Sequence, residues 1–339
     1  MPMNSPPTDH EGRLLNRELS WVEFNARVLD LVSDQKLPLL ERVKFVSIFS
    51  NNLDEFIMKR VGWLRQRLRS GEGPTALEPW PVAAVFDAVR ESIRQLQELQ
   101  TRCFEGQIRP ALAGAGIELL GYSELSAEDR RRVDVWFARE VFPVLTPLAV
   151  DPGHRFPFIS NLSENVGVLV TDSDHAEPMF ARVKVPGMSR QWVRIPDQAD
   201  GAASTSGRGR FVHLAEVIRH NLDDLFPGMR IVEAAYFRVY RNAEVQTEDD
   251  DDTDNLLELV EAQLKKRRFA EAVRLEVSKG MSWRMLGPMM EELELTPLDV
   301  QERTGTLDYT DLNEIVDLDR PELKNGSWRP VVPRRLQDK

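Results

Sequence analysis

The chain has 339 residues, of which 42% are hydrophobic and 29% charged, and its formal net charge at pH 7 is −11. This length and composition are typical of a globular protein with two or three domains, and no run of about 18 apolar residues predicts a membrane-spanning helix. The acidic balance argues against a general nucleic-acid binder.

The charge is distributed unevenly along the chain. Between Arg13 and Ser70 there are eleven Arg and Lys residues against seven Asp and Glu, whereas Glu244–Asp254 carries seven acids and no base. A basic helical region in an acidic chain can face a polyanion, although a solvated face is the commoner reason for one. Residues 1–12 predict a disordered polar leader without the apolar centre of a signal peptide. The single cysteine, Cys103, leaves no internal disulfide or cysteine-based metal site and favours a reducing cytoplasm.

Three long amphipathic helices are predicted in the first part of the chain. The first starts with Ser20 as N-cap and Glu23 three residues later, as in a capping box. The second runs from about residue 38 to 68, and the third from about residue 80 to 112, with apolar side chains every three or four residues. Helices of this kind joined by short breaks predict an antiparallel three-helix bundle over residues 13–113.

The second helix contains two polar residues on its apolar stripe, within the stretch IFSNNLDEFIMKRV at 48–61. Asn52 and Arg60 share the side of the helix that carries the large apolar residues, while Glu55 and Lys59 flank Asn52 and can pair with each other. A buried amide or guanidinium without a partner costs about 1–3 kcal/mol or more. Both residues therefore need partners, which are either side chains of the same fold or a ligand or second domain.

From residue 117 the sequence pattern changes to strands mixed with helices. The two kinds do not alternate strictly, which predicts a mixed α+β head domain over residues 117–320 and an α+β multidomain fold for the chain. The stretch 328–336 is predicted to be extended and is basic, so residues 321–339 are predicted to form a truncated linker to a further domain. The predicted strands are 166–171, 179–185, 191–195, 211–214, 231–245 and 273–277, and the predicted helices are 127–141, 215–225, 255–269, 282–293, 297–303 and 310–316.

Few motifs in the sequence carry catalytic chemistry. There is no phosphate-binding loop ending in Gly-Lys-Ser/Thr, no nucleophile elbow and no protein-kinase signature. The histidines lack metal-ligand spacing and are each interpreted as structural or surface residues; they are His10, His154, His175, His213 and His220. The acidic run after Glu244 is interpreted as a solvated turn, with calcium as a weaker alternative.

A proline-rich loop, Asp151–Asn161, is the other candidate site. His154 and Arg155 can bind phosphate there by charge and by paired hydrogen bonds. The alternative is a proline-stiffened corner that holds two aromatic side chains in the core.

Five stretches of the sequence resemble the long-chain polyphosphate kinase family, type 1, and the resemblance runs from about residue 13 to the end. The second and third of these stretches are the most specific. The family has an N-terminal helical domain, a head domain and two C-terminal domains similar to phospholipase D, so the resemblance implies the first two here. The stretches are LNRELSWVEFNARVL (15–29), PLLERVKFVSIFSNNLDEFIMKRV (38–61), VLTPLAVDPGHRFPFISNLSENVGVLV (144–170), FRVYRNAEV (237–245) and RRFAEAVRLEV (267–277).

The resemblance implies a reaction and assigns roles to two residues. The family reversibly transfers the terminal phosphate of ATP to polyphosphate through a phosphohistidine, uses magnesium, and forms dimers through its head domains. Asn52 matches the family's nucleotide-contacting asparagine, the second in Ser-Asn-Asn-Leu-Asp-Glu-Phe. Arg60 belongs to the same motif, and we expect it to contact another domain or an anion. The phosphohistidine and the magnesium-linked arginines belong to the C-terminal domains, so no catalytic residue or metal ligand is expected in this chain.

Two functions follow as hypotheses. In the first, the chain is the N-terminal portion of an ATP:polyphosphate phosphotransferase, inactive alone, which supplies part of the ATP site and of a homodimer or higher homo-oligomer interface. Its small-molecule partners are then ATP, ADP and polyphosphate. In the second, the chain is a stand-alone module that binds nucleotide or polyphosphate, or only dimerises, without catalysis.

Overall fold

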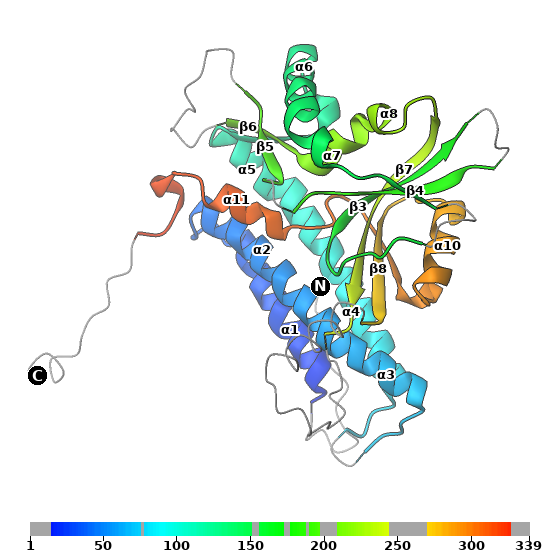
Figure 1. The fold of residues 1–339 in the computed structure, drawn as a ribbon. Coiled ribbons are helices and arrows are strands. Elements are labelled where there is room, and N and C mark those ends of the chain that lie inside the picture. The colour runs from blue at the N-terminus through cyan, green and yellow to red at the C-terminus, as the bar shows by residue number, and fades with distance from the viewer. Residues whose placement is uncertain are drawn as a thin grey trace, which may run out of the picture.

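The computed structural model describes residues 15–75, 78–150, 156–172, 177–187, 190–196, 209–243 and 270–326. A helical bundle formed by the first part of the chain lies beside a region of sheets and covering helices formed by the rest (Figure 1). This arrangement confirms the predicted α+β fold with a helical N-terminal region. The predicted helix 255–269, the acidic run 248–254, His154 and Arg155 lie outside the described residues.

The bundle consists of three long helical rods, as the apolar periodicity predicts. Two of the rods contain a π-helical turn that the sequence did not predict. The elements are α1 (Arg17–Asp30), α2 (Leu39–Phe56), the π-helical turn Ile57–Val61, α3 (Gly62–Ser70), α4 (Val82–Cys103), the π-helical turn Phe104–Ile108 and α5 (Arg109–Gly114).

The start of α1 differs from the prediction. Asn16 is the N-cap, and its Oδ1 accepts a hydrogen bond from the backbone N–H of Leu19 at 3.1 Å. Ser20 lies inside the helix, where its Oγ donates to the carbonyl of Asn16 at 2.7 Å. The predicted cap at Ser20 is therefore wrong, because Asn16 caps equally well and an earlier start gains nearly one turn of helix.

The head region contains two sheets. A three-stranded sheet has the order β1 (Ile117–Leu120), β6 (Gly209–His213), β5 (Trp192–Arg194), with β1 parallel to β6. A six-stranded sheet is antiparallel except between its last two strands. Its order is β2 (Leu148–Val150), β4 (Met179–Lys184), β3 (Glu164–Thr171), β7 (Arg230–Arg241), β8 (Ala272–Ser278) and β9 (Val300–Arg303).

Helices cover both faces of the six-stranded sheet. Along β3, Val166, Val168 and Val170 face a core shared with α6 and α7, whereas Leu169 faces a second core built with α10. The side chains thus alternate between two buried faces, as the period of a strand requires. The covering helices are α6 (Ala127–Trp136), continued by a π-helical turn to Val141, α7 (Leu214–His220), α8 (Leu222–Leu225) and α10 (Trp283–Glu292), whereas α11 (Asn313–Val316) lies against α2 of the bundle.

The predicted helix at 297–303 is wrong. Pro297–Asp299 forms a single 3-10 turn, and the chain then continues as β9, which pairs in parallel with β8. Thr296 closes the turn, since its N–H and its Oγ1 both donate to Oδ2 of Asp299 at 2.8 Å. The strand forms because pairing with the edge of β8 outweighs the weak helical preference of so short a segment.

The bundle and the head region share a continuous core. The largest hydrophobic cluster contains the bundle helices together with Tyr240 of β7 and Val273 of β8. The C-terminal segment joins them, because Tyr309, Leu312 and Ile315 are buried in the same cluster and α11 packs along α2 (Figure 1). The charged groups described below lie at this junction.

Gly62 marks a close approach between the bundle and the head region. A Cβ atom there would lie 3.0 Å from Oδ1 of Asn242 and 3.3 Å from Cγ1 of Val273. We expect Gly62→Ala to lower the free energy of unfolding by about 1–2 kcal/mol through overpacking. Gly106 is the matched control, since a Cβ there meets nothing within 4 Å, and Gly106→Ala should be neutral or stabilising by about 0.5–1 kcal/mol. Urea unfolding measures both, and equal effects would contradict the close approach.

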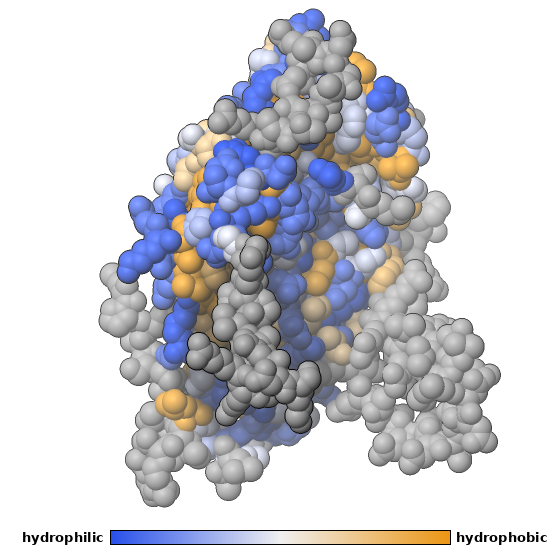
Figure 2. Space-filling model, turned by 90° about the vertical axis from the view of Figure 1, so that its left-hand side faces the viewer, coloured by the Kyte–Doolittle hydropathy of each residue, from blue (hydrophilic) through white to orange (hydrophobic). Residues whose placement is uncertain are grey.

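Hydrophilic side chains cover most of the described surface in Figure 2, and hydrophobic ones gather there only in small separate groups. None of the helices in the described part of the chain has both the length and the apolar character to cross a membrane.

Candidate functional site

Asn52 and Arg60 lie in a row of contacts between α1 and the second helical rod. The two rods run antiparallel, so residues spaced by three or four on one meet residues spaced by four on the other. Three pairs result: Asn25 with Asn52, Trp21 with Phe56, and Glu18 with Arg60. These contacts explain why polar residues interrupt the apolar stripe and why two separate sequence stretches carry them.

The Asn25–Asn52 pair fixes the orientation of both amides. Asn25 is fully buried, and its Nδ2 donates to the carbonyl of Phe49 at 3.2 Å. Its Oδ1 therefore faces Asn52 and accepts from Nδ2 of that residue at 3.2 Å. Asn52 is half-buried, and among the described residues its Oδ1 accepts no hydrogen bond. The donor side of the Asn52 amide is thus held by the bundle, while its acceptor oxygen remains for a ligand or water.

Arg60 is bound within the bundle. Its guanidinium pairs with the carboxylate of Glu18, which is 3% exposed, and stacks over the ring of Trp63 with 4.5 Å from Cζ to the ring centroid. Burial opposes the charge on Glu18, but Arg60 holds the pKa of this carboxyl below its ordinary value. Arg60 thus ties α1 to the second rod, and a role in binding an anion stays a prediction.

The aromatic pair lies between these two polar contacts. Trp21 and Phe56 stack with ring centroids 4.1 Å apart and planes inclined by 7°. Stacked rings of this kind contribute about 0.5–1.5 kcal/mol beyond the area that they bury. The rigid centre keeps Asn52 and Arg60 at fixed places along the row.

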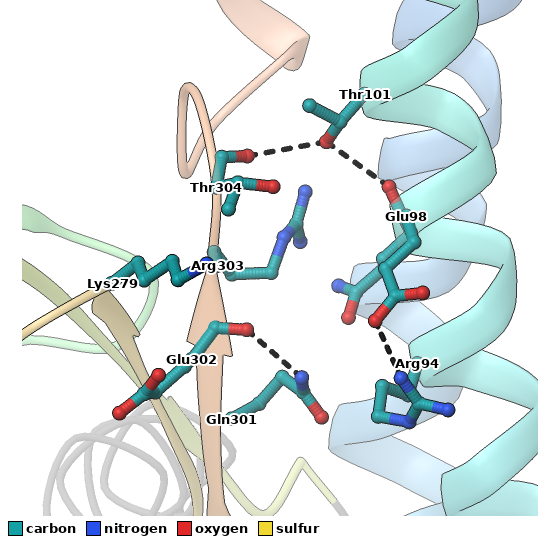
Figure 3. Close-up of a pocket in the computed structure, with 9 residues that line it drawn as sticks. Arg94, Glu98, Thr101, Lys279, Gln301, Glu302, Arg303 and Thr304 are labelled. Atoms are coloured by element: carbon teal, nitrogen blue, oxygen red, sulfur yellow. Dashed lines mark hydrogen bonds and ion pairs between the residues drawn. The ribbon is translucent and has the colours of Figure 1, made fainter.

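Three clefts open elsewhere on the described surface, and neither Asn52 nor Arg60 lines any of them. One of about 600 Å³ lies beside Phe156–Ile159 and Arg241, and one of about 520 Å³ runs along α6. The third, of about 260 Å³, lies between α4 and β9 (Figure 3) and is lined by Arg94, Gln97, Glu98, Thr101, Lys279, Gln301, Glu302, Arg303 and Thr304.

The described half of the proline-rich loop is packed against the sheet. Phe156 stacks on Phe180 with ring centroids 5.6 Å apart, and the Arg241 guanidinium lies over Phe158 at 4.5 Å. Ile159 is fully buried. These contacts belong to the corner with core aromatics that the sequence offered as the alternative, whereas the phosphate role of His154 and Arg155 stays a prediction.

A buried ion pair, which the sequence analysis did not identify, joins the bundle to the head region. Asp54 of α2 accepts hydrogen bonds from Nη1 and Nη2 of Arg238 on β7, at 3.1 and 2.7 Å, and from the hydroxyl of Tyr240 at 2.9 Å. Arg238 also pairs with Asp308 at 3.0 Å and donates to the carbonyl of Leu162 at 3.0 Å. Three segments far apart in the sequence thus meet at one guanidinium.

The charged groups of this cluster shift one another's pKa values. Burial raises the pKa of Asp54 to about 6 against the opposing charge of Arg238, so the carboxylate is ionised at neutral pH. Burial also opposes the charge on Arg238, yet Asp54, Tyr240 and Asp308 hold its pKa well above the ordinary value. The pair is therefore an ion pair at neutral pH.

Next to this cluster, Glu164, His213 and Asp311 form a second group of titratable side chains. Nε2 of His213 lies 3.5 Å from Oδ2 of Asp311, and one donor atom of each residue lies within 4.8 Å of the others. Burial raises the pKa of Glu164 to about 7. Burial lowers the pKa of His213, but Glu164 and Asp311 more than offset it and raise that pKa to about 9.

A third buried network holds β8 and β9 against α4. Glu276 is completely buried and accepts hydrogen bonds from Gln97 at 2.7 Å and from Arg274 at 3.2 Å. Arg303 pairs with its other carboxylate oxygen at 3.3 Å. The network lies beside the cleft of Figure 3, in which Arg303 also appears.

The chain matches two family models that together cover most of its length. Residues 14–120 match the model described as the polyphosphate kinase N-terminal domain, and residues 128–315 match the polyphosphate kinase middle domain.

Curated relatives and a solved structure agree with these matches. The polyphosphate kinase of Mycobacterium avium (strain 104) is 43% identical over 330 residues, covering 97% of this chain and 45% of that protein. The polyphosphate kinase of Thermosynechococcus vestitus is 41% identical over 329 residues, covering 97% and 44%. The crystal structure of polyphosphate kinase from Porphyromonas gingivalis superposes with a TM-score of 0.76 at 23% identity, over 96% of this chain and 44% of that one, which shows a shared fold. The chain thus spans less than half the length of these relatives.

Proposed function

The chain belongs to the polyphosphate kinase family, with its N-terminal and middle domains, and from this premise we propose that it is part of an enzyme that reversibly transfers the terminal phosphate of ATP to polyphosphate. The name polyphosphate kinase belongs to the relatives as whole proteins, and the chain covers 45% of the length of the Mycobacterium avium relative. Phosphoryl transfer needs an activated nucleophile and a clamp on the moving phosphoryl group. We propose that the remainder of the enzyme supplies both, together with the magnesium ligands.

In this proposal the chain contributes one contact to the nucleotide through Asn52. The observation that carries it is the held amide, whose Nδ2 is engaged by Asn25 while its Oδ1 is left without a donor from the described residues. An amide oxygen can accept from the amino group of adenine or from a ribose hydroxyl. Because Asn25 and the Phe49 carbonyl fix the amide in advance, little side-chain freedom is lost when the nucleotide binds.

The test reconstitutes activity from two pieces. This chain is mixed with a separately produced portion of the Mycobacterium avium relative that the match does not cover, and polyphosphate synthesis from ATP is measured. We expect activity only in the mixture, and Asn52→Ala should raise KM for ATP about three- to tenfold through one lost hydrogen bond. The adjacent exposed Asn51 is the control, since Asn51→Ala removes an equal side chain outside the row.

Two outcomes of this experiment contradict the proposal. Absence of synthesis in the mixture, with both pieces shown to be folded by circular dichroism, counts against a role in this enzyme. Equal KM values for Asn52→Ala and Asn51→Ala remove Asn52 from the nucleotide site.

The second candidate is a stand-alone module that binds nucleotide or polyphosphate. Because the acceptor oxygen of Asn52 is already oriented in this chain, calorimetry with ATP and with polyphosphate on the chain alone distinguishes it. Heat that disappears in Asn52→Ala favours the module, whereas no heat with either ligand removes it.

We also propose that the enzyme is a cytoplasmic homodimer or higher homo-oligomer, with the contact formed by the head region. The groove along α6 supports this surface, because it is lined by Trp136, Arg131 and Arg132 and contains Val135, whose side chain is 68% exposed. Light scattering of the chain gives the oligomeric state. A monomeric wild type argues against the homodimer, and a dimer that persists in Val135→Glu argues against this face.

A further inference from the structure

Three segments of the chain bring metal-ligating side chains together at the junction of the bundle and the sheets. Glu164 is the first residue of β3, His213 is the last residue of β6, and Asp311 lies in the 3-10 turn that leads into α11. One donor atom from each residue lies within 4.8 Å of the other two. The two sheets and the C-terminal segment thus converge on one small volume.

Two polar atoms of these residues have no hydrogen-bond partner within the described part of the chain. Oε2 of Glu164 and Nε2 of His213 are both buried, and neither forms a hydrogen bond with any of the residues that the structure describes. His213 is only 6% exposed, and its neighbour Trp192 meets the ring edge-on at 5.1 Å between centroids. Buried polar atoms are normally satisfied, and two unsatisfied ones that face the same volume need an explanation.

The spacing within the group fits a shared ion better than a direct bond. His213 Nε2 and Asp311 Oδ2 are 3.5 Å apart, whereas a charge-assisted hydrogen bond is about 2.7–2.9 Å long. Two ligands at about 2.1 Å from a tetrahedral zinc ion lie about 3.4 Å from each other. The observed separation therefore matches that of two ligands on one metal ion.

The charge around the group also favours a cation. Burial raises the pKa of Glu164 and of Asp311, and the negative charge of the nearby Asp308 raises both further. The neighbouring permanent cation, Arg238, is already shared between Asp308 and Asp54. Even with His213 counted as a cation, the four carboxyl groups of Asp54, Glu164, Asp308 and Asp311 outnumber the two basic groups of Arg238 and His213 in this buried region, where excess charge of one sign is costly.

We propose that Glu164, His213 and Asp311 bind a divalent transition-metal ion, zinc or manganese, with water completing its coordination. One neutral imidazole nitrogen and two carboxylate oxygens suit these ions, whereas magnesium prefers oxygen ligands alone. Binding of the ion would therefore release the proton that His213 holds in the metal-free chain. The ion would hold β3, β6 and the turn before α11 together, which is a structural role separate from the nucleotide contact at Asn52. The site is independent of the proposed phosphotransfer.

The first test is the metal content and thermal stability of the chain. The untagged chain is purified without chelator for elemental analysis, then treated with EDTA and heated with added zinc, manganese or magnesium chloride. We expect bound zinc or manganese near one equivalent, and a rise in Tm of about 3–5 °C at a hundredfold excess over Kd for that ion but not for magnesium. His213→Gln and Asp311→Asn should lose the rise. His220→Gln should keep it, because His220 lies on the exposed end of α7.

A second test identifies the metal ligands by the visible absorption of bound cobalt. Cobalt bound to a protein imidazole and carboxylates absorbs visible light, and this band should appear in the wild-type chain and in His220→Gln but not in His213→Gln. Glu164→Gln provides the same measurement if His213→Gln does not fold. The proposal is overturned if the chain binds no zinc, manganese or cobalt, or if the variants of the three residues respond to metal as the wild type does.

Discussion

Asp54→Ala is expected to lower the free energy of unfolding by about 3–5 kcal/mol, because it leaves the guanidinium of Arg238 without its main counter-charge in the shared core. Arg238 is only 3% exposed, so water cannot replace the carboxylate. The hydroxyl of Tyr240 loses its acceptor in the same variant. Urea unfolding at neutral pH measures the change, and tryptophan fluorescence and circular dichroism should report a single transition if bundle and head region unfold together.

Two further variants distinguish the effect of losing the ion pair from the effect of losing side-chain volume. Asp87→Ala removes an aspartate that is 69% exposed and pairs with Arg90 on the surface of α4, and it should cost less than about 1 kcal/mol. Asp54→Leu combined with Arg238→Met should recover part of the loss, because apolar replacements of a buried pair are often well tolerated. A loss in Asp54→Ala as small as that in Asp87→Ala would show that the pair does not join the two regions.

The row of contacts that contains Asn52 was only half predictable from the sequence. The apolar period of the second helix placed Asn52 and Arg60 on the inner side, and the structure gives both of them partners there. Their partners, Asn25 and Glu18, belong to the first helix, and the pairing depends on how the two helices are aligned. The apolar periodicity of one helix does not determine how that helix is aligned with another.

The junction clusters were missed because their members are far apart in the sequence. Asp54 and Arg238 are separated by 184 positions, and nothing local to either residue indicates the other. A signal was nevertheless present in the strands, where Arg238 and Glu276 alternate with apolar residues. In a sheet that is buried on both faces every position is internal, so these charges had to be paired inside the protein.

His213 illustrates the same limit for metal sites. Its spacing from the other histidines contains no ligand pattern, and we interpreted it from sequence as a structural or surface residue. The structure brings it beside Glu164 and Asp311, which come from a different sheet and from the C-terminal segment. Ligands that come from separate elements are defined by the packing of those elements, and spacing rules apply only to ligands on one element.

Glu276→Gln is expected to lower the free energy of unfolding by about 3–5 kcal/mol, because it removes the charge that two buried guanidinium groups share. The substitution keeps the shape of the side chain, so little of the loss comes from packing. Arg303 is the more affected partner, since its Nη2 already lacks a hydrogen-bond acceptor among the residues that the structure describes. Glu302→Gln on the adjacent exposed position of β9 is the control and should cost less than about 0.5 kcal/mol.

The pH dependence of this effect provides a check on its electrostatic origin. Burial opposes the charge on Glu276, but Arg303 and Arg274 hold its pKa below the ordinary value of 4.5. A carboxyl with a lowered pKa in the folded state stabilises the protein fully above the ordinary value, and this stabilisation is lost as the pH falls through the folded value. The gap between the wild type and Glu276→Gln should therefore stay constant above about pH 5 and narrow below about pH 4. A gap that is the same at all pH values would mean that Glu276 acts through shape alone.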